Sequence, residues 1–190
     1  MVVKSQLKLI KSLQQKKYRN QYGLFVAEGI KVVGELLQSS FVPHQIYTSD
    51  ASELLGITDS FIKVSEKELK QMSGLRAPNK VLGVFGMTEP EPVDFEDWIL
   101  VVDTVQDPGN LGTIIRLCDW FNIRHLVCSS GTVDKYNPKV LQATMGSIAR
   151  VNVVHMDLVQ FLRDVPLPIY GAFADGISMY GLALPPSGVL

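Results

Sequence analysis

Residues 101–116 read Val-Val-Asp-Thr-Val-Gln-Asp-Pro-Gly-Asn-Leu-Gly-Thr-Ile-Ile-Arg and combine the end of an apolar strand, a turn and the start of a helix. Asn110 is predicted to cap this helix, and Gly112 and Arg116 are four residues apart, which places them on one helix face. Because Gly112 has no side chain, a ligand or another backbone could approach there while Arg116 reaches over it. Strands followed by turns and helices in this order build parallel sheets.

The charge of Arg116 needs an anionic partner, because the surrounding helix is apolar. That partner could be Asp103 or Asp107, which would make Arg116 a brace for the turn, or it could be an anionic substrate. The spacing favours neither alternative. The stretch lacks the Gly-x-Gly spacing of a dinucleotide fingerprint and the Gly-Lys-Ser/Thr of a Walker loop. Phosphate binding at the helix amino terminus is left open.

The alternation of strands and helices extends over the carboxyl-terminal half. We expect strands at 98–102, 125–128, 151–154 and 169–173, and helices at 111–121, 138–147 and 157–163. This order predicts a parallel sheet covered on both faces, with its ligand site beyond the carboxyl ends of the strands. Val189 and Leu190 form an apolar pair after a turn, so the chain is expected to end within an element.

Residues 1–87 are predicted to form a smaller α/β unit. We expect helices at 5–16, 30–37 and 65–72, and strands at 24–27, 45–48, 61–64 and 81–87. Ser65 and Glu68 form a capping box at the start of the third helix. Residues 88–97 carry two prolines and five acidic residues without periodicity. The sequence therefore predicts two α/β domains, 1–87 and 98–190, joined by a linker at 88–97.

The composition of the 190-residue chain, 46% of it apolar, is that of a globular protein. No apolar run approaches the ~18 residues of a membrane span, and the start of the chain lacks a secretory segment. A cytoplasmic protein without membrane contact is expected. Cys118 and Cys128 are expected to be buried free thiols. The three histidines stand apart in the sequence, which disfavours a metal site and suggests structural roles. They are His44, His125 and His155.

The charge is distributed unevenly along the chain. Residues 1–88 hold twelve Lys/Arg and seven Asp/Glu, whereas residues 89–190 hold six and twelve. Six basic residues lie between Lys4 and Arg19, and the first acidic residue is Glu28. A solvated helix face would explain a basic run of this kind. Because Tyr18 and Tyr22 place stacking groups beside the cations, the pattern favours a surface that binds nucleic acid.

The stretch Asn110-Leu-Gly-Thr-Ile-Ile-Arg116 resembles the first signature motif, Asn-x-Gly-x-x-x-Arg, of the SpoU class of RNA ribose methyltransferases. Residues 103–109, 133–139 and 143–147 are also similar to this family, which belongs to the SPOUT superfamily. Residues 17–19 and 25–29 resemble its L30e-like RNA-binding extension. The resemblance implies a small L30e-like α/β domain followed by a parallel-sheet, trefoil-knotted SPOUT domain. It also implies that this chain ends before the knot is complete, because the family's second and third motifs would follow Leu190.

The resemblance further implies methyl transfer from S-adenosylmethionine to a ribose 2′-hydroxyl of RNA, with ribosomal RNA favoured over transfer RNA, by a homodimer. Arg116 stands at the family's catalytic position. An arginine keeps its proton in proteins, so we expect it to act as a cation rather than as a base. Asn110 would hold the turn and the target ribose. The residues expected to bind the methyl donor are Ala172, Phe173, Ala174 and Gly176.

The residues expected to contact RNA are Lys16, Lys17, Tyr18, Arg19, Lys139 and Arg150. Trp120 and Phe121 are expected to lie in a core or an interface rather than to stack on bases. One alternative function is a non-catalytic RNA-binding protein that keeps the second domain as a scaffold. Another is a nucleotide-binding regulatory module, which would bind phosphate at residues 109–112.

Overall fold

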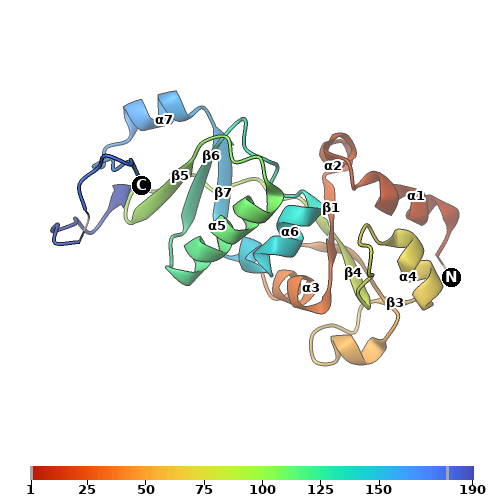
Figure 1. Ribbon diagram of the computed structural model, residues 1–190. Coiled ribbons are helices and arrows are strands. Elements are labelled where there is room, and N and C mark those ends of the chain that lie inside the picture. Colours follow the sequence, from red (N-terminus) through yellow and green to blue (C-terminus); the bar gives the residue numbers. More distant parts are fainter. Residues whose placement is uncertain (1, 179) are drawn as a thin grey trace.

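The computed structural model of the protein describes residues 2–178 and 180–190, whose strands form two four-stranded sheets (Figure 1). The amino-terminal sheet has the order β1-β4-β2-β3. In it, β4 runs antiparallel to β1 and β2, and β3 runs parallel to β2. Its strands are β1 (Leu24–Glu28), β2 (Pro43–Thr48), β3 (Ile62–Lys63) and β4 (Val81–Gly86).

The carboxyl-terminal sheet has the order β7-β6-β5-β8, and all its pairs are parallel. Its strands are β5 (Trp98–Val102), β6 (His125–Ser129), β7 (Asn152–Met156) and β8 (Gly188–Val189). The predicted α/β class with a parallel sheet in the second half is therefore confirmed. The prediction that the chain ends before the knot is complete stays a prediction.

Helices cover both faces of the parallel sheet. In β6, Leu126 and Cys128 pack in one apolar cluster with α5 (Pro108–Trp120) and α6 (Pro138–Thr144). Val127 faces the other way and packs in a cluster with α7 (Leu158–Asp164), which Figure 1 shows on the opposite side of the sheet. The alternation of side chains along a strand produces these two layers.

The amino-terminal sheet is covered by α1 (Lys4–Ser12), α2 (Lys16–Tyr22), α3 (Ile30–Leu37) and α4 (Glu66–Met72). Short 3-10 helices follow β2 and α6, at η1 (Ala51–Leu54) and η2 (Ser147–Ala149). The predicted capping box of α4 is confirmed, because Ser65 and Glu68 each accept the other's backbone N–H. The prediction of one helix over 5–16 is wrong, since the chain forms two helices there.

The break between α1 and α2 is stabilised by Arg19. Its guanidinium donates to the backbone carbonyls of Leu13 and Gln14, at 2.9 and 3.0 Å. The last carbonyls of a helix have no partners within the helix, so a cation at this position stabilises the end of α1.

The two halves share one apolar core. Phe25 and Phe41 of the first half lie in the same buried cluster as Tyr136 and Ile148 of the second. The rings of Phe25 and Tyr136 are stacked, with centroids 4.6 Å apart. The Tyr136 hydroxyl lies 3.0 Å from the Thr88 backbone nitrogen, which donates to it. The sheets are thus packed together through their side chains.

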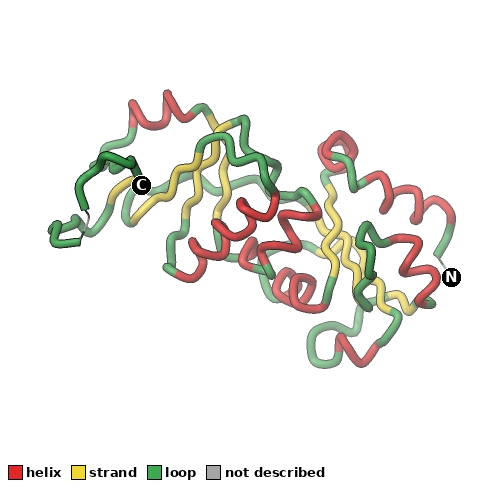
Figure 2. The backbone as a smooth tube through the Cα atoms, viewed as in Figure 1, coloured by secondary structure: helices red, strands yellow, loops and turns green. Residues whose placement is uncertain are grey.

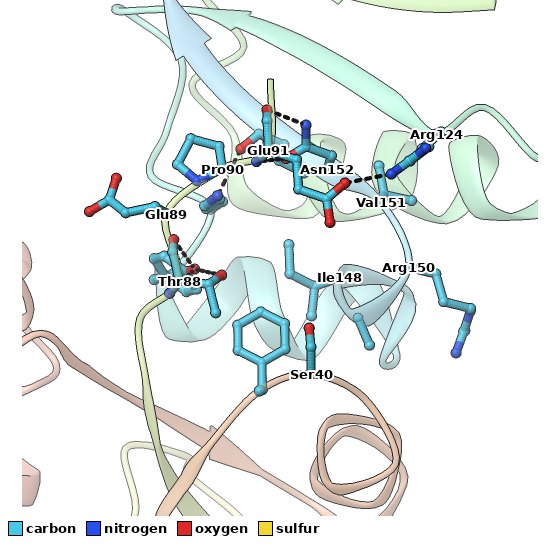
Figure 3. A pocket seen from close by; sticks show the side chains of 15 residues that line it. Ser40, Thr88, Glu89, Pro90, Glu91, Arg124, Ile148, Arg150, Val151 and Asn152 are labelled. Carbon is cyan, nitrogen blue, oxygen red and sulfur yellow. Dashed lines mark hydrogen bonds and ion pairs between the residues drawn. The ribbon is translucent and has the colours of Figure 1, made fainter. Parts of the chain in front are cut away.

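The acidic segment 88–97, predicted as a linker, is held against the second sheet (Figure 3). The Glu91 N–H donates to the Asn152 side chain at 3.1 Å, and the Glu91 carboxylate pairs with Arg124 at 2.6 Å. Asp94 lies 2.9 Å from the buried His125 ring, which supports the structural role predicted for that histidine. The proposed domain boundaries at this segment stay a prediction.

Two further predicted elements differ from the structure. The helix expected over 138–147 ends at Thr144, because Met145 and Gly146 adopt the left-handed values φ 53° and 100°. The strand expected over 169–173 is reduced to a single bridge between Ile169 and Val189, and Figure 2 draws the chain between α7 and β8 as loop. The neighbouring strand β8 spans only two residues and offers a short edge for pairing. None of the helices in the described part of the chain is long and apolar enough to cross a membrane.

Candidate active site

The first turn of α5 is stabilised by Asp107 rather than by Asn110. The Asp107 carboxylate accepts the Asn110 N–H at 2.9 Å, and Pro108 occupies the first helical position. Proline suits this position because its missing N–H would have no partner there. The prediction that Asn110 caps the helix is therefore wrong. Its side chain is exposed in the first turn.

Gly112 allows a close approach between two helices. A Cβ atom at this position would overlap the Cβ of Ala143 and would lie 3.0 Å from the Val140 carbonyl oxygen. Ala143 and Val140 belong to α6, so this helix fills the space that the sequence left open for a ligand. Of the two alternatives for Gly112, a ligand or another backbone, the structure has the second, because the glycine brings α5 against the backbone of α6.

Arg116 is exposed one turn after Gly112, and among the described residues it takes part in no ion pair or side-chain hydrogen bond. The two acids considered as its partners bind elsewhere. Asp107 accepts the Asn110 N–H, and Asp103 accepts the Thr104 hydroxyl at 2.8 Å. That hydrogen bond lowers the pKa of Asp103. Arg116 therefore does not brace the turn. Of the two alternatives for its partner, an acid of the turn or an anionic substrate, the second remains.

Arg116 lines a cavity of about 630 Å³ between α3, α5 and the end of α6. Lys31 and Glu35 contribute from α3, and Leu117 and Trp120 from α5. Lys31, like Arg116, has no acidic partner among the residues described. A cavity of this volume is large enough for a small ligand or one nucleotide. Its two unpaired cations favour an anion.

Arg150 neutralises the acids at the rim of this cavity. Its guanidinium donates to both carboxylate oxygens of Asp119 at 2.8 Å and also pairs with Glu35. The hydrogen bond from Arg150 lowers the pKa of Asp119. The prediction that Arg150 contacts RNA is not supported, because its donors are engaged within the protein. Arg150 instead joins α3 to α5.

The chain is similar in sequence to known RNA methyltransferases. Residues 97–190 match the SpoU rRNA Methylase family, and residues 4–83 match the MRM3-like substrate binding domain. The 23S rRNA (guanosine(2553)-2'-O)-methyltransferase RlmP of Bacillus subtilis is 30% identical over 177 residues, which are 92% of this chain and 68% of that protein. This chain belongs to the SpoU rRNA methylase family.

Other relatives agree with the SpoU assignment. A putative RNA methyltransferase of the TrmH family from Porphyromonas gingivalis has 36% identity and a TM-score of 0.89, over 100% of this chain and 79% of that one. The mitochondrial rRNA methyltransferase 3 of Mus musculus is 27% identical over 75% of this chain. The chain spans only 38% of that mouse protein. The AdoMet-bound rRNA methyltransferase of Sinorhizobium meliloti, at 23% identity, shares the fold, with a TM-score of 0.82 over 100% of this chain and 78% of that one.

The two SpoU motif residues point into different parts of the surface. Arg116 lines the cavity described above, whereas Asn110 lines none of the five main cavities in the described part of the chain. They are six residues apart on α5, which is about one and two-thirds helical turns. The structure therefore does not bring Asn110 and Arg116 together in one cavity.

Arg19 of this SpoU family member was predicted to contact RNA, but the structure buries it. Its side chain is only 2% exposed and pairs with Asp134. Its charge was expected to face RNA, but its donors are used inside the protein. The sequence could not reveal this, because Asp134 lies 115 positions away.

The remaining predicted RNA contacts are accessible. Lys16 and Lys17 are exposed on α2, and Lys139 is exposed at the start of α6. The rings of Tyr18 and Tyr22 are stacked at 6.4 Å, and the Lys17 ammonium lies 5.8 Å from the Tyr18 ring. Sequence reasoning missed Lys31 in the Arg116 cavity, because a single lysine on an apolar helix gives no functional signal.

The four residues expected to bind the methyl donor lie in the irregular segment after Ile169. All are exposed and line none of the five main cavities among the described residues. Within residues 171–176, the Gly176 N–H donates to the Phe173 carbonyl, and the other described backbone groups have no backbone partner. The Phe173 side chain is 75% exposed. Free backbone N–H and C=O groups can hydrogen-bond to the edge of an adenine, and an exposed aromatic ring can stack on its face.

Proposed function

We propose that this chain transfers a methyl group from S-adenosylmethionine to a ribose 2′-hydroxyl of ribosomal RNA. The observation that carries the proposal is Arg116. It is the arginine of the SpoU motif, it is exposed in a cavity, and it has no acidic partner among the described residues. The relative from Bacillus subtilis is named for 2'-O-methylation of 23S rRNA.

The chemical problem is that a ribose hydroxyl is a weak nucleophile. Negative charge develops on its oxygen as the new carbon–oxygen bond forms, and a fixed cation stabilises that charge. Arg116 supplies this cation and orients the adjoining phosphate, while remaining protonated itself. Asn110 is exposed in the first turn of the same helix, outside the Arg116 cavity, and we assign it a contact to the target ribose where the RNA extends beyond that cavity. The hydroxyl proton passes to solvent water as the methylated ribose forms.

Ala172, Phe173, Ala174 and Gly176 are the residues proposed to hold the methyl donor. This assignment is supported by the chemistry of the segment, which combines free backbone groups with the exposed Phe173 ring. When bound there, S-adenosylmethionine supplies an electrophilic methyl group and leaves as S-adenosylhomocysteine.

The amino-terminal unit, residues 1–87, is proposed to bind the RNA substrate. Exposed lysines lie along its first two helices, α1 and α2. None of these lysines has an ion-pair partner among the described residues. They are Lys4, Lys8, Lys11, Lys16 and Lys17. We include Tyr18 in this surface, because an aromatic ring beside a lysine provides a base with a stacking partner.

A methylation assay tests the proposal. The full chain is incubated with labelled S-adenosylmethionine and unmodified 23S ribosomal RNA, with unmodified transfer RNA as the second substrate. We expect labelled ribosomal RNA with the wild type, and a loss of about 10²- to 10³-fold in rate with Arg116→Ala, which removes the stabilising cation. Arg163→Ala is the matched control, because Arg163 is an exposed arginine on α7.

Calorimetric titration separates the catalytic function from its alternative. Saturable binding of S-adenosylmethionine by the wild type and by Arg116→Ala supports a methyltransferase whose chemistry depends on Arg116. A folded wild type that binds ribosomal RNA but neither binds S-adenosylmethionine nor transfers a methyl group supports a non-catalytic RNA-binding protein.

We also propose that the protein is a homodimer through an apolar face of α5. Leu117, Trp120 and Phe121 are 49%, 83% and 68% exposed, so they do not belong to the core of this chain. Leu117 and Trp120 also line the Arg116 cavity, so a second copy seated here would border Arg116. Sedimentation equilibrium is expected to show dimers with the wild type and with Leu55→Ser, an exposed leucine elsewhere, and monomers with Trp120→Ser.

The proposed location is the cytoplasm, which is supported by the bacterial relative named for 23S rRNA. Fractionation of cells that produce the tagged chain is expected to recover it with the ribosomal RNA of the cytosol. Recovery with membranes would contradict this location.

A further inference from the structure

A second cavity, of about 510 Å³, lies on the other side of the junction between the two sheets. Its walls are the loop at residues 74–76, the first residue of α5 and the first turn of α6. It shares no lining residue with the Arg116 cavity. Nothing in the function proposed above uses it.

Two cations face this cavity, Arg76 and Lys139. Both are exposed, and neither has an acidic partner among the residues that the structure describes. The acid in the cavity wall is Glu28, whose two carboxylate oxygens accept the Ser73 hydroxyl and, at 2.8 Å, the Gly74 N–H. These bonds hold Glu28 in place as part of the wall. The cations that remain free can pair with an anionic ligand.

Gln14, in the wall of the cavity, carries an unused hydrogen-bond donor just below the cavity surface. The side-chain Nε2 of Gln14 is buried and has no partner among the described residues. Gln14 is pressed against Gly74, where an added Cβ would lie 2.7 Å from the Gln14 Oε1. Buried polar groups are almost always hydrogen-bonded, so an orphaned donor in the wall of a cavity points to a ligand that offers an acceptor.

Apolar surface completes the cavity. Leu75, Pro108 and Pro138 line it beside the polar groups. The apolar side chains can pack against a base, the unpaired donor can bind the edge of that base, and the two cations can pair with its flanking phosphates. The volume lies in the range of sites that hold a ligand of nucleotide size.

We propose that this cavity binds one nucleotide of the RNA substrate, with its phosphates against Arg76 and Lys139, and that the Gln14 side chain turns so that its Nε2 donates to an acceptor of the base. The inference rests on the proposed function only in taking RNA as the substrate. Pro108 lines the cavity and is two residues before Asn110, so the bound nucleotide anchors the RNA strand next to the SpoU motif. Arg76 and Gln14 are the residues that this proposal adds to the RNA-binding set.

The test measures the binding of a fluorescein-labelled oligouridylate and oligoadenylate to the full chain as salt is raised. Arg76→Gln and Lys139→Gln are each expected to weaken binding several-fold and to reduce the slope of log affinity against log salt by about 0.7, the value for one phosphate contact of a single strand. Arg163→Gln is the matched control, because Arg163 is exposed on α7, outside the amino-terminal unit, and does not line this cavity.

Gln142→Trp is a second variant, which fills the cavity without changing its charge. It is expected to weaken RNA binding while the thermal unfolding midpoint stays near that of the wild type. Competition distinguishes a nucleotide from a bare anion. Uridine 5′-monophosphate should displace the oligonucleotide from the wild type at concentrations where inorganic phosphate does not. Equal displacement by both would show an anion site only and would overturn the proposal.

The methylation assay keeps this inference separate from the proposed function. If the wild type methylates RNA and all three cavity variants bind RNA as the wild type does, the nucleotide site is wrong and the proposed function stands. If the wild type transfers no methyl group but the cavity variants lose RNA affinity, the nucleotide site stands and the proposed function is wrong.

Discussion

Arg19 on α2 and Asp134, 115 positions further along the chain, form an ion pair at the junction of the two sheets. The Arg19 Nε lies 3.2 Å from the Asp134 carboxylate, and the two side chains are 2% and 14% exposed. The same guanidinium donates to the end of α1. One buried cation therefore holds the basic helices against the half of the molecule that carries Arg116.

Asp134→Asn should destabilise the protein by about 3–5 kcal/mol, because removing one partner leaves the Arg19 charge buried without its counter-ion. The measurement is the free energy of unfolding in urea. Lys80→Met, which breaks the exposed pair of Lys80 with Asp50, is the control and should leave the unfolding midpoint nearly unchanged. An Asp134→Asn protein as stable as this control would show that the buried pair does not hold the halves together.

Gly112→Ala should destabilise the protein by about 1–3 kcal/mol, because its Cβ overlaps Ala143 and forces α5 away from α6. Combining Gly112→Ala with Ala143→Gly removes the overlapping methyl group and should restore part of the loss. Urea unfolding of the two single variants and the double variant gives the coupling between the sites. Additive effects would contradict a direct contact.

Acid should weaken the link between α3 and α5. The hydrogen bond from Arg150 lowers the pKa of Asp119 in the folded protein. This carboxylate therefore contributes stability above its unfolded pKa, near pH 4, and the contribution is lost as the pH falls through the lower folded value. When the pH is lowered below about 4, we expect the urea midpoint of the wild type to decrease more steeply than that of Asp119→Asn. Parallel curves would assign the acid sensitivity to other groups.

Cys118 and Cys128 should resist thiol reagents while the protein is folded. Both are buried, and burial raises the pKa of each thiol to about 12. The thiolate is the reactive form, and at neutral pH its fraction is very small. A colorimetric disulfide reagent should therefore modify both thiols in urea and neither in buffer. Rapid modification of the native protein would contradict the burial of these thiols in the core.

The sequence predicts the elements whose signals are local. The apolar run at Trp98–Val102, the Ser65 capping box and the helix at Ile30–Leu37 each depend on neighbouring residues, and the structure has all three. The burial of both cysteines also follows from their apolar neighbours. Arg116 is recognised through the motif, and the structure adds that no acidic side chain in the described chain neutralises it.

Features that depend on distant partners could not be predicted. The break between α1 and α2 and the burial of Arg19 both depend on contacts that the sequence does not show. The role of Gly112 also depends on a distant partner, because its neighbour Ala143 is on another helix. The sequence at position 112 therefore allows either a ligand or another backbone, and only the structure shows that the backbone of α6 lies there.

The apolar cluster that contains Phe25, Phe41, Tyr136 and Ile148 belongs to both halves of the molecule. Loss of either half would leave large apolar side chains of the other in water. Cooperativity then extends across the predicted domain boundary, and heating should produce one calorimetric transition rather than two. A fragment cut at residue 88 would be a poor reporter of RNA binding, because its exposed half-core would favour aggregation.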